Sequence, residues 1–324
     1  LKKDNYKFVW IEQIAPNPTQ EDLVNALRQI DHNKVRTIIA IGGGSAIDLA
    51  KGLSVFSNHP HKENIDIVSE SIKNKSYVGN TFSDIIAVPT TSGSGSEVTQ
   101  WATIWDKDNK VKYSLDTPSL QPKLAIIVPE LTTSVPNLMT LSTGFDAICQ
   151  AIEAYWSKHT TPIVQEIAYR AVQLIMENLR KATEEPKNLE VRENLARGSV
   201  LAGIAFSKTR TTACHSISYP LTMFHDIPHG IAATLTLDGV AKRNKGYFPN
   251  DQRLFELFKY HDGIKHWVNS TCEGVFEMNL AYFGVKEDNL QKIIDNAFTA
   301  GRMDNNPRKL TRNDVLQILS EILT

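Results

Sequence analysis

The stretch Thr37–Leu53, TIIAIGGGSAIDLAKGL, decides the fold class. Its first five residues are apolar or β-branched, so they predict a buried strand that ends at Gly42-Gly43-Gly44-Ser45. The residues from Ala46 to Leu53 then follow a helical period. A strand, a glycine-rich loop and a helix in this order begin a βαβ unit, and therefore predict a parallel sheet with helices on both faces.

Two loops of this kind point to a ligand site. Three glycines let a ligand approach the backbone, and N–H groups at a helix start bind phosphate oxygens. The spacing is not G-x-G-x-x-G, so a plain tight turn stays an alternative. However, Pro89–Glu97 (PTTSGSGSE) also leaves a predicted strand, Ile85–Val88, and adds hydroxyl groups. Loops at the carboxyl ends of strands are where open α/β sheets collect ligands.

The chain changes character near Ser134. Before it, the patterns alternate between strands and helices; after Pro136, helical patterns run almost without a break. We therefore expect an α/β Rossmann-like domain over 1–134 and an all-α domain over 135–324. The first part is expected to contain strands at Tyr6–Ile11 and Leu124–Val128, a helix at Thr19–Ile30, a hairpin of Trp101–Trp105 with Val111–Leu115, and a surface connection at Ser57–Asn80. The second part is expected to contain a helix carrying Ile148–Tyr155, one beginning at Thr161-Pro162, one at Leu189–Phe206, and a last helix capped by Thr311 and Asp314.

The amino-acid composition argues against several classes of protein. The 324 residues are 41% hydrophobic and 22% charged, with a formal net charge of −1, which argues against disorder and against nucleic acid as a partner. Three cysteines without paired spacing indicate free thiols in a reducing cytoplasm. No run is apolar enough to predict a membrane span. Because Leu1-Lys2-Lys3-Asp4 is neither a start nor a signal peptide, we expect the natural chain to begin upstream.

A metal site is a second candidate feature. Asp146 and Gln150 are four residues apart and share a helix face, and His215 and His229 follow on later helices. One carboxylate and two imidazoles that converge can hold a divalent transition metal with a position left open for substrate. A solvated helix face and two structural histidines remain the alternative.

Four motifs in order now point to a family. Gly42–Lys51, Pro89–Thr99, Gly144–Ala147 and Ile227–Gly230 together resemble the iron-containing (group III) alcohol dehydrogenase family, which has the dehydroquinate synthase-like architecture. The resemblance covers nearly the whole chain, except that the family's first strand and helix would lie upstream of Leu1.

The resemblance implies NAD or NADP as cofactor and a divalent metal, Fe²⁺ or Zn²⁺. The metal ligands would be Asp146, Gln150, His215 and His229, but the family usually has His where this chain has Gln150. An amide oxygen is a poorer ligand for these metals than imidazole, so we expect a weakened site. Tyr219 lies four residues beyond His215 and is a candidate to relay a proton during catalysis, with plain core packing as the alternative. The implied cofactor-binding residues are Asn17, Gly42, Gly43, Gly44, Ser45, Asp48, Thr90, Thr91, Ser92, Lys112 and Leu141.

Within the family, further segments are most similar to the phosphonoacetaldehyde reductase branch. Such a substrate carries close to two negative charges, and Lys208 and Arg210 lie on a predicted linker just before His215, so they are candidates to bind it. The alternatives are a general metal-dependent alcohol dehydrogenase, a lyase or polyol-phosphate dehydrogenase relative, and a cofactor-binding relative with a degenerate metal site. The resemblance also implies a homodimer. The segments that carry this similarity are Ala102–Asp106, Lys112–Leu115, Thr211–Ala213, Ser218–Thr222 and Asn305–Arg308.

Overall fold

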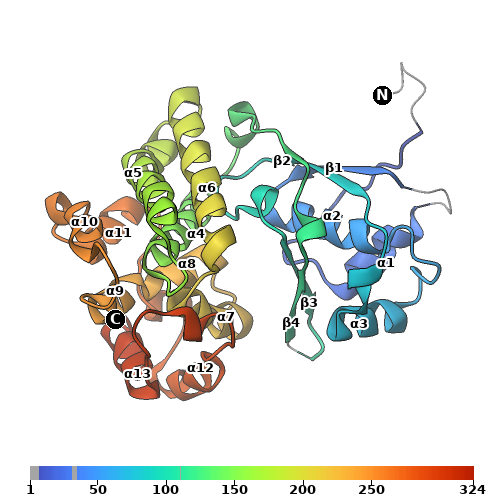
Figure 1. Ribbon diagram of the computed structural model, residues 1–324. Coiled ribbons are helices and arrows are strands. Elements are labelled where there is room, and N and C mark those ends of the chain that lie inside the picture. Colours follow the sequence, from blue (N-terminus) through green and yellow to red (C-terminus); the bar gives the residue numbers. More distant parts are fainter. Residues whose placement is uncertain (1–6, 31–34, 110) are drawn as a thin grey trace. The chain divides into compact units, whose positions relative to one another are not determined.

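The computed structural model describes residues 7–30, 35–109 and 111–324. The chain divides into two compact units (Figure 1). The first unit comprises the residues up to Thr90 together with Ser96–Ile127, and the second comprises Thr91–Gly95 together with Val128–Thr324. The α/β character of the first and the helical character of the second confirm the predicted fold class.

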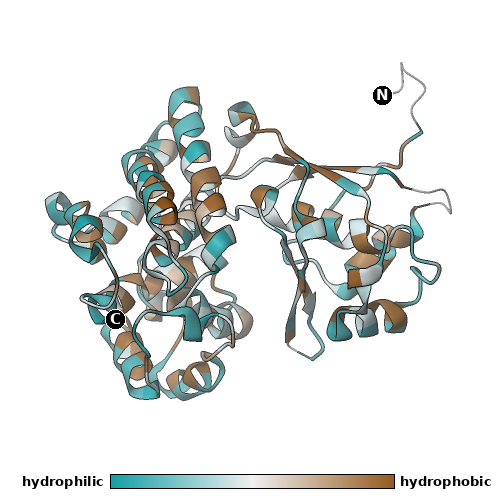
Figure 2. Ribbon diagram, viewed as in Figure 1, coloured by the Kyte–Doolittle hydropathy of each residue, from teal (hydrophilic) through white to brown (hydrophobic). Residues whose placement is uncertain are grey.

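A parallel sheet organises the first unit. Strands β1 (Thr37–Gly42), β2 (Asp84–Pro89) and β5 (Leu124–Ala125) are hydrogen-bonded in the order β1-β2-β5, and Thr37 pairs with Asp84. Their apolar residues show as brown stretches in Figure 2. Helix α2 (Gly44–Phe56) follows β1 directly, so the predicted strand, loop and helix are confirmed.

Helix α2 is buried between two layers, which explains why it is apolar on nearly all sides. On one side, Ile47 and Ala50 pack against Ala40 and Ala87 of the sheet. On the other side lies a larger core, to which α2 contributes Leu53 and Phe56. The remaining elements around that core are α1 (Gln20–Arg28), α3 (Ile65–Asn74) and the antiparallel hairpin of β3 (Trp101–Asp106) with β4 (Val111–Asp116), whose predicted pairing is confirmed.

Three expectations for this unit were wrong. Residues 7–11 of the predicted strand Tyr6–Ile11 form no strand, and Tyr6 lies outside the described residues. The predicted surface connection at 57–80 contains α3, because Asn64 caps its start by accepting hydrogen bonds from the N–H groups of Asp66 and Ile67. The sheet is also not covered on both faces by described residues, since the side chains of Ile39 and Ile41 are about half exposed.

A buried lysine of α2 holds the segment that follows the second glycine-rich loop. Lys51 on α2 is fully buried, and its Nζ donates hydrogen bonds to Ser96 Oγ (3.0 Å), Thr99 O (2.9 Å) and Trp101 O (2.6 Å). Burial lowers the pKa of Lys51 to about 8, against the opposing charges of Asp48 and Glu97. The cation therefore fixes the segment after the second loop onto α2.

The second unit is helical. Helix α4 (Asn137–Trp156) is buried along nearly its whole length, and α5 (Pro162–Glu184) and α6 (Leu189–Thr209) pack against it. Thr161 caps α5, and Thr311 with Asp314 forms the predicted capping box of the last helix. All three cysteines are free and buried. The helices of this unit are α4 (Asn137–Trp156), α5 (Pro162–Glu184), α6 (Leu189–Thr209), α7 (Ala213–His225), α8 (His229–Leu235), α9 (Leu237–Asn244), α10 (Asp251–Glu256), α11 (Ile264–Cys272), α12 (Leu290–Asn296) and α13 (Arg312–Glu321).

Within residues 7–30, 35–109 and 111–324, no helix is long and apolar enough to cross a bilayer.

Replacing Lys51 by Met tests the role of the buried cation. The variant leaves Asp48 and Glu97 buried without their countercharge, so we expect a loss of about 3 to 5 kcal/mol in the free energy of unfolding. Denaturant titration measures it. Lys123→Ala is the control, because the exposed pair of Lys123 with Asp84 should contribute less than about 1 kcal/mol. Equal effects of the two substitutions would show that Lys51 has no special role.

Candidate functional site

The start of α2 is open to an anion. Gly43 is its N-cap residue, and no side chain caps this end of the helix. Gly42 must be glycine, because a Cβ there would lie 2.5 Å from the Cβ of Ala46. The N–H of Thr90 donates to Gly42 O (3.0 Å), so the second loop begins beside the first at the carboxyl ends of β1 and β2. This is the arrangement that the sequence predicts for phosphate binding.

The other predicted cofactor residues of the first unit have different surroundings. Asn17 has a φ of 56° and donates its N–H to Ser45 Oγ (3.1 Å), which brings the two residues together. Lys112 lies on β4 with its Nζ 5.9 Å from the ring centroid of Trp105. Asp48 accepts hydrogen bonds from Ser96 Oγ (2.6 Å) and from the N–H of Thr103 (2.9 Å). Burial raises the pKa of Asp48, and its observed contacts are internal.

Three of the predicted cofactor residues belong to the second unit: Thr91, Ser92 and Leu141. Thr91 is half-buried, whereas Ser92 and Leu141 are buried. The segment Thr91–Gly95 lies directly on the helices, since a Cβ at Gly93 would be 2.5 Å from the Cβ of Thr143 on α4. Gly93 therefore permits close packing of the loop on α4, and Gly95 permits it on α6.

Asp146, His215 and His229 come together from three helices of the second unit, α4, α7 and α8. One ligand atom of each lies within 4.8 Å of the others, and His215 Nε2 is 3.1 Å from Asp146 Oδ1. Gly230 makes this possible, because a Cβ there would lie 1.8 Å from Ser142 O on α4. The start of α8 thus touches α4 directly, which brings His229 to the cluster.

Gln150 contributes an unpartnered oxygen to the same face of α4. Its Nε2 donates to Ser94 O at 3.5 Å, while its Oε1 is buried and has no hydrogen-bond partner. The contact of Nε2 with a carbonyl fixes which end of the amide is oxygen. A buried acceptor without a donor is rare in proteins, and a bound cation would satisfy it. One carboxylate, two imidazoles and this amide oxygen are a donor set that fits a divalent metal.

Glu153 completes the cluster, and the sequence analysis missed it. This fully buried carboxylate accepts hydrogen bonds from Thr212 Oγ1 (2.8 Å) and from the N–H of Cys214 (2.7 Å), and it lies 2.5 Å from His215 Nδ1. Burial alone would lower the pKa of His215, but the carboxylates of Glu153 and Asp146 raise it to about 10. Burial would likewise raise the pKa of Glu153, yet the charge and hydrogen bond of His215 lower it. Glu153 follows Asp146 by seven residues, a helical spacing that gives a sequence signal once the ligands are known.

Tyr219 lies against this cluster. Its ring stacks on that of His229, with centroids 6.0 Å apart and planes 9° apart. Its hydroxyl accepts a hydrogen bond from Arg302 Nε at 3.3 Å. Arg302 is a second residue that the sequence analysis missed, because it lies 83 positions from Tyr219 in an irregular segment.

The two predicted substrate residues lie at the end of α6. This helix continues to Thr209, so the linker predicted from Ser207 is wrong: α6 extends three positions beyond Phe206, and the hydroxyl of Ser207 donates within the helix to Ile204 O. Lys208 is exposed in its last turn. Arg210 is the C-cap residue and has φ 62° and ψ 174°, a conformation found almost only in glycine. Strain of this kind gathers at functional sites.

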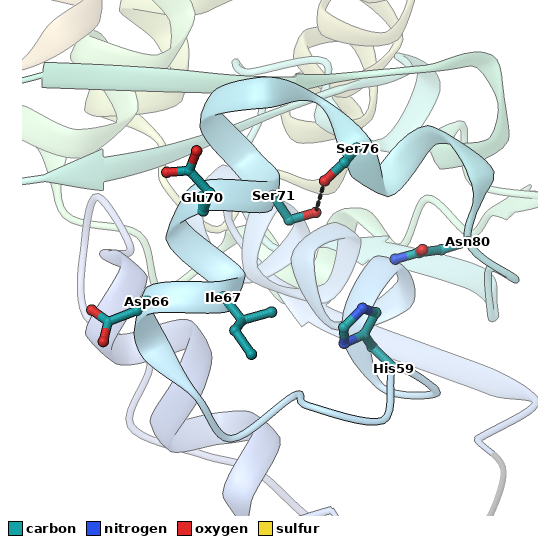
Figure 3. A pocket seen from close by; sticks show the side chains of 7 residues that line it. All are labelled: His59, Asp66, Ile67, Glu70, Ser71, Ser76 and Asn80. Carbon is teal, nitrogen blue, oxygen red and sulfur yellow. Dashed lines mark hydrogen bonds between the residues drawn. The ribbon is translucent and has the colours of Figure 1, made fainter.

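A separate pocket of about 620 Å³ lies in the first unit (Figure 3). Its lining mixes acidic and small polar side chains, and Ser76 Oγ donates to Ser71 Oγ at 3.0 Å. None of the predicted site residues lines it. The lining residues are His59, Asp66, Ile67, Glu70, Ser71, Ser76 and Asn80.

Comparisons with known proteins agree with this geometry. Residues 1–129 match the model of the iron-containing alcohol dehydrogenase family, and residues 140–323 match the C-terminal model of the same family. An NADPH-dependent butanol dehydrogenase from Clostridium saccharobutylicum is 30% identical, with 98% of this chain and 84% of that protein covered. A 1,3-propanediol dehydrogenase from Citrobacter freundii is 28% identical, with 99% and 84% covered.

Among solved structures, a sulfoacetaldehyde reductase from Bifidobacterium kashiwanohense in complex with NAD⁺ is 30% identical and superimposes with a TM-score of 0.84. The match covers 96% of this chain and 82% of that one. The two family models together span almost all of the sequence. The chain therefore belongs to the iron-containing alcohol dehydrogenase family, whose members are oxidoreductases.

Proposed function

We propose that this protein reduces a small aldehyde to a primary alcohol with NADH or NADPH. The observation that carries the proposal is the cluster of Asp146, His215 and His229, with the buried unpartnered oxygen of Gln150 one helical turn from Asp146 on α4. Relatives with this family's fold include an NADPH-dependent butanol dehydrogenase and a sulfoacetaldehyde reductase bound to NAD⁺. A nicotinamide carries out the redox step, so the protein's task is to position the aldehyde and stabilise charge.

The cofactor would be bound through Gly42–Ser45. The N–H groups at the uncapped start of α2 favour the negative pyrophosphate, and the glycines let it approach. Asn17, Thr90, Thr91, Ser92 and Lys112 are the residues proposed to contact the remainder of the dinucleotide. For Asp48 and Leu141 the proposed contribution is weaker, because one is engaged internally and the other is buried.

Asp146, His215 and His229 would hold a divalent metal, with Gln150 as a weak fourth ligand. When bound, such a metal polarises a carbonyl oxygen and stabilises the alkoxide that develops. Glu153 orients His215 through Nδ1, which leaves Nε2 to face the cluster. Tyr219 lies on the face of His229 with its Oη held by Arg302, so this hydroxyl would deliver the proton to the alkoxide.

Among small aldehydes, we propose phosphonoacetaldehyde as the substrate. Segments of the chain resemble the reductases of that compound, and the related sulfoacetaldehyde reductase acts, by its name, on a comparably small aldehyde with an anionic group. Arg210 would bind the anionic group. Lys208, exposed in the last turn of α6, would add a long-range attraction. An uncharged alcohol is the second candidate, since the butanol and propanediol dehydrogenases among the relatives are named for such substrates.

Oxidation of NADH or NADPH with a panel of aldehydes tests the proposal. We expect turnover with at least one short aldehyde, and a dependence on added Fe²⁺ or Zn²⁺. A lyase relative would form product without net oxidation of the cofactor. A degenerate cofactor-binding relative would give no product with any metal, and either result would overturn the proposal.

Gly43→Val tests the cofactor loop. Gly43 has φ −75° and ψ −172°, an ordinary extended conformation, so valine should fit the fold but cover the N–H groups of α2. We expect dinucleotide binding to fall below detection in a fluorescence titration, with an unchanged circular dichroism spectrum. Unchanged affinity for NADH and NADPH would remove this loop from the site.

Gln150→His tests the weakened metal site. An imidazole at position 150 is a stronger ligand than the amide, so the variant should bind Fe²⁺ or Zn²⁺ about 10 to 100 times more tightly. Elemental analysis after dialysis measures the retained metal, and Gln150→Leu, which removes the oxygen, should retain less than the parent. A full equivalent of tightly held metal in the parent would contradict the view that Gln150 weakens the site.

A further inference from the structure

Arg302 lies close to the cluster of Asp146, His215 and His229. Its Nε donates to Tyr219 Oη at 3.3 Å, and the Tyr219 ring stacks on His229. Only the width of one tyrosine therefore separates this guanidinium from a proposed metal ligand. Its Nη1 donates to Gly301 O at 2.9 Å, which fixes the plane of the group.

No carboxylate pairs with Arg302 in the part of the chain that the structure describes. Its hydrogen bonds there go to a phenol and a main-chain carbonyl, and Nη2 has no acceptor. The side chain is half-buried. Other arginines of the same unit differ, since Arg308 pairs with Asp314 at 3.1 Å and Arg180 with Glu184 at 2.6 Å. A guanidinium that keeps its charge uncompensated beside a reaction centre is suited to an anionic ligand.

A second guanidinium lies near the first. Arg210 Nη1 is 3.9 Å from the position that a Cβ of Gly301 would occupy, so it lies beside the segment that carries Arg302. This segment is fixed to the helices. Asn305 Nδ2 donates to Gly301 O (2.9 Å) and to Thr211 O (3.2 Å), and the N–H of Thr299 donates to Ser216 Oγ (2.9 Å). The segment is thus attached at Thr211 and Ser216, the residues that directly follow Arg210 and His215.

We propose that Arg302, with Arg210 beside it, binds the anionic group of the substrate and makes the enzyme selective for a short aldehyde that carries a sulfonate or phosphonate. This inference rests on the proposed aldehyde reduction. Both groups are tetrahedral and present several oxygens, which match the paired N–H donors of a guanidinium. The hydrogen bond from Arg302 to Tyr219 places the bound anion one side chain away from the hydroxyl that faces the aldehyde oxygen.

Arg302→Gln is the decisive variant. Glutamine keeps an N–H donor for Tyr219 but removes the charge, so it separates anion binding from support of the tyrosine. We expect kcat/KM to fall about 10 to 150-fold more for sulfoacetaldehyde and phosphonoacetaldehyde than for propanal, whose own change measures the effect on Tyr219. Arg210→Ala should behave in the same way. Arg308→Ala is the matched control, because that arginine already has Asp314 as its partner, and it should leave the preference for charged substrates unchanged.

Comparing phosphonoacetaldehyde with sulfoacetaldehyde distinguishes a site for a phosphonate from a site for a sulfonate. A larger loss with phosphonoacetaldehyde than with sulfoacetaldehyde would follow from its higher charge, and a loss confined to one compound identifies the substrate; both support the inference. Equal losses for charged and uncharged aldehydes would overturn it, since Arg302 would then act only on Tyr219. A parent enzyme that prefers propanal would overturn it too, while leaving aldehyde reduction itself intact.

A binding measurement keeps the inference testable without turnover. Calorimetric titration with 2-hydroxyethanesulfonate and 2-hydroxyethylphosphonate should show binding to the parent that Arg302→Gln weakens about 10-fold or more. If no aldehyde is reduced but this difference is found, the proposed reaction fails and the anion site stands. If the parent binds neither compound, the anion site fails.

Discussion

The carboxylate of Glu153 determines how the helical unit is built around the cluster of Asp146, His215 and His229. It lies fully buried on α4, at the point where α7 begins, and it carries a charge that burial alone would not tolerate. Its oxygens accept from the side chain of Thr212 and from the N–H of Cys214, so the carboxylate caps α7 from another helix. The same group faces His215 Nδ1. One buried charge therefore sets the start of a helix, its distance from α4 and the orientation of a candidate metal ligand.

The first unit uses the opposite charge for the same purpose. Lys51 is buried among main-chain carbonyls, where the unpaired acceptors of an irregular loop need donors. Asp48, three residues earlier on α2, accepts from Ser96 and from the N–H of Thr103. In both units a helix next to the site carries a buried ion that fixes a loop without regular hydrogen bonding. These segments can then hold their hydroxyl groups at fixed positions, which a flexible loop would not do.

The sequence predicts the parts that depend on local pattern and short spacing. The strand, loop and helix at Thr37–Leu53, the hairpin and the helix caps all follow from side-chain periodicity and turn chemistry, and the structure contains them. Pairs such as Asp146 and Gln150 are visible because four residues on a helix define a face. Arg302 was not predictable, since its contact with Tyr219 depends on the path of an irregular segment far along the chain. Helix α3 was missed because its stretch is rich in polar residues, although Ile65, Val68 and Ile72 follow a helical period and Asn64 caps its start.

Charge balance links two unusual features of the proposed site: Gln150 among its ligands, and the nearby Arg302 and Arg210. Gln150 brings no charge, so Asp146 is the one carboxylate among the four proposed ligands. Arg302 and Arg210 place positive charge nearby, which raises the electrostatic cost of holding a divalent cation. An anionic substrate offsets that cost, because its sulfonate or phosphonate brings one or two negative charges to the guanidinium groups. An uncharged aldehyde provides no such compensation. If Gln150 is a weak fourth ligand, the two arginines favour the proposed preference for anionic over uncharged aldehydes.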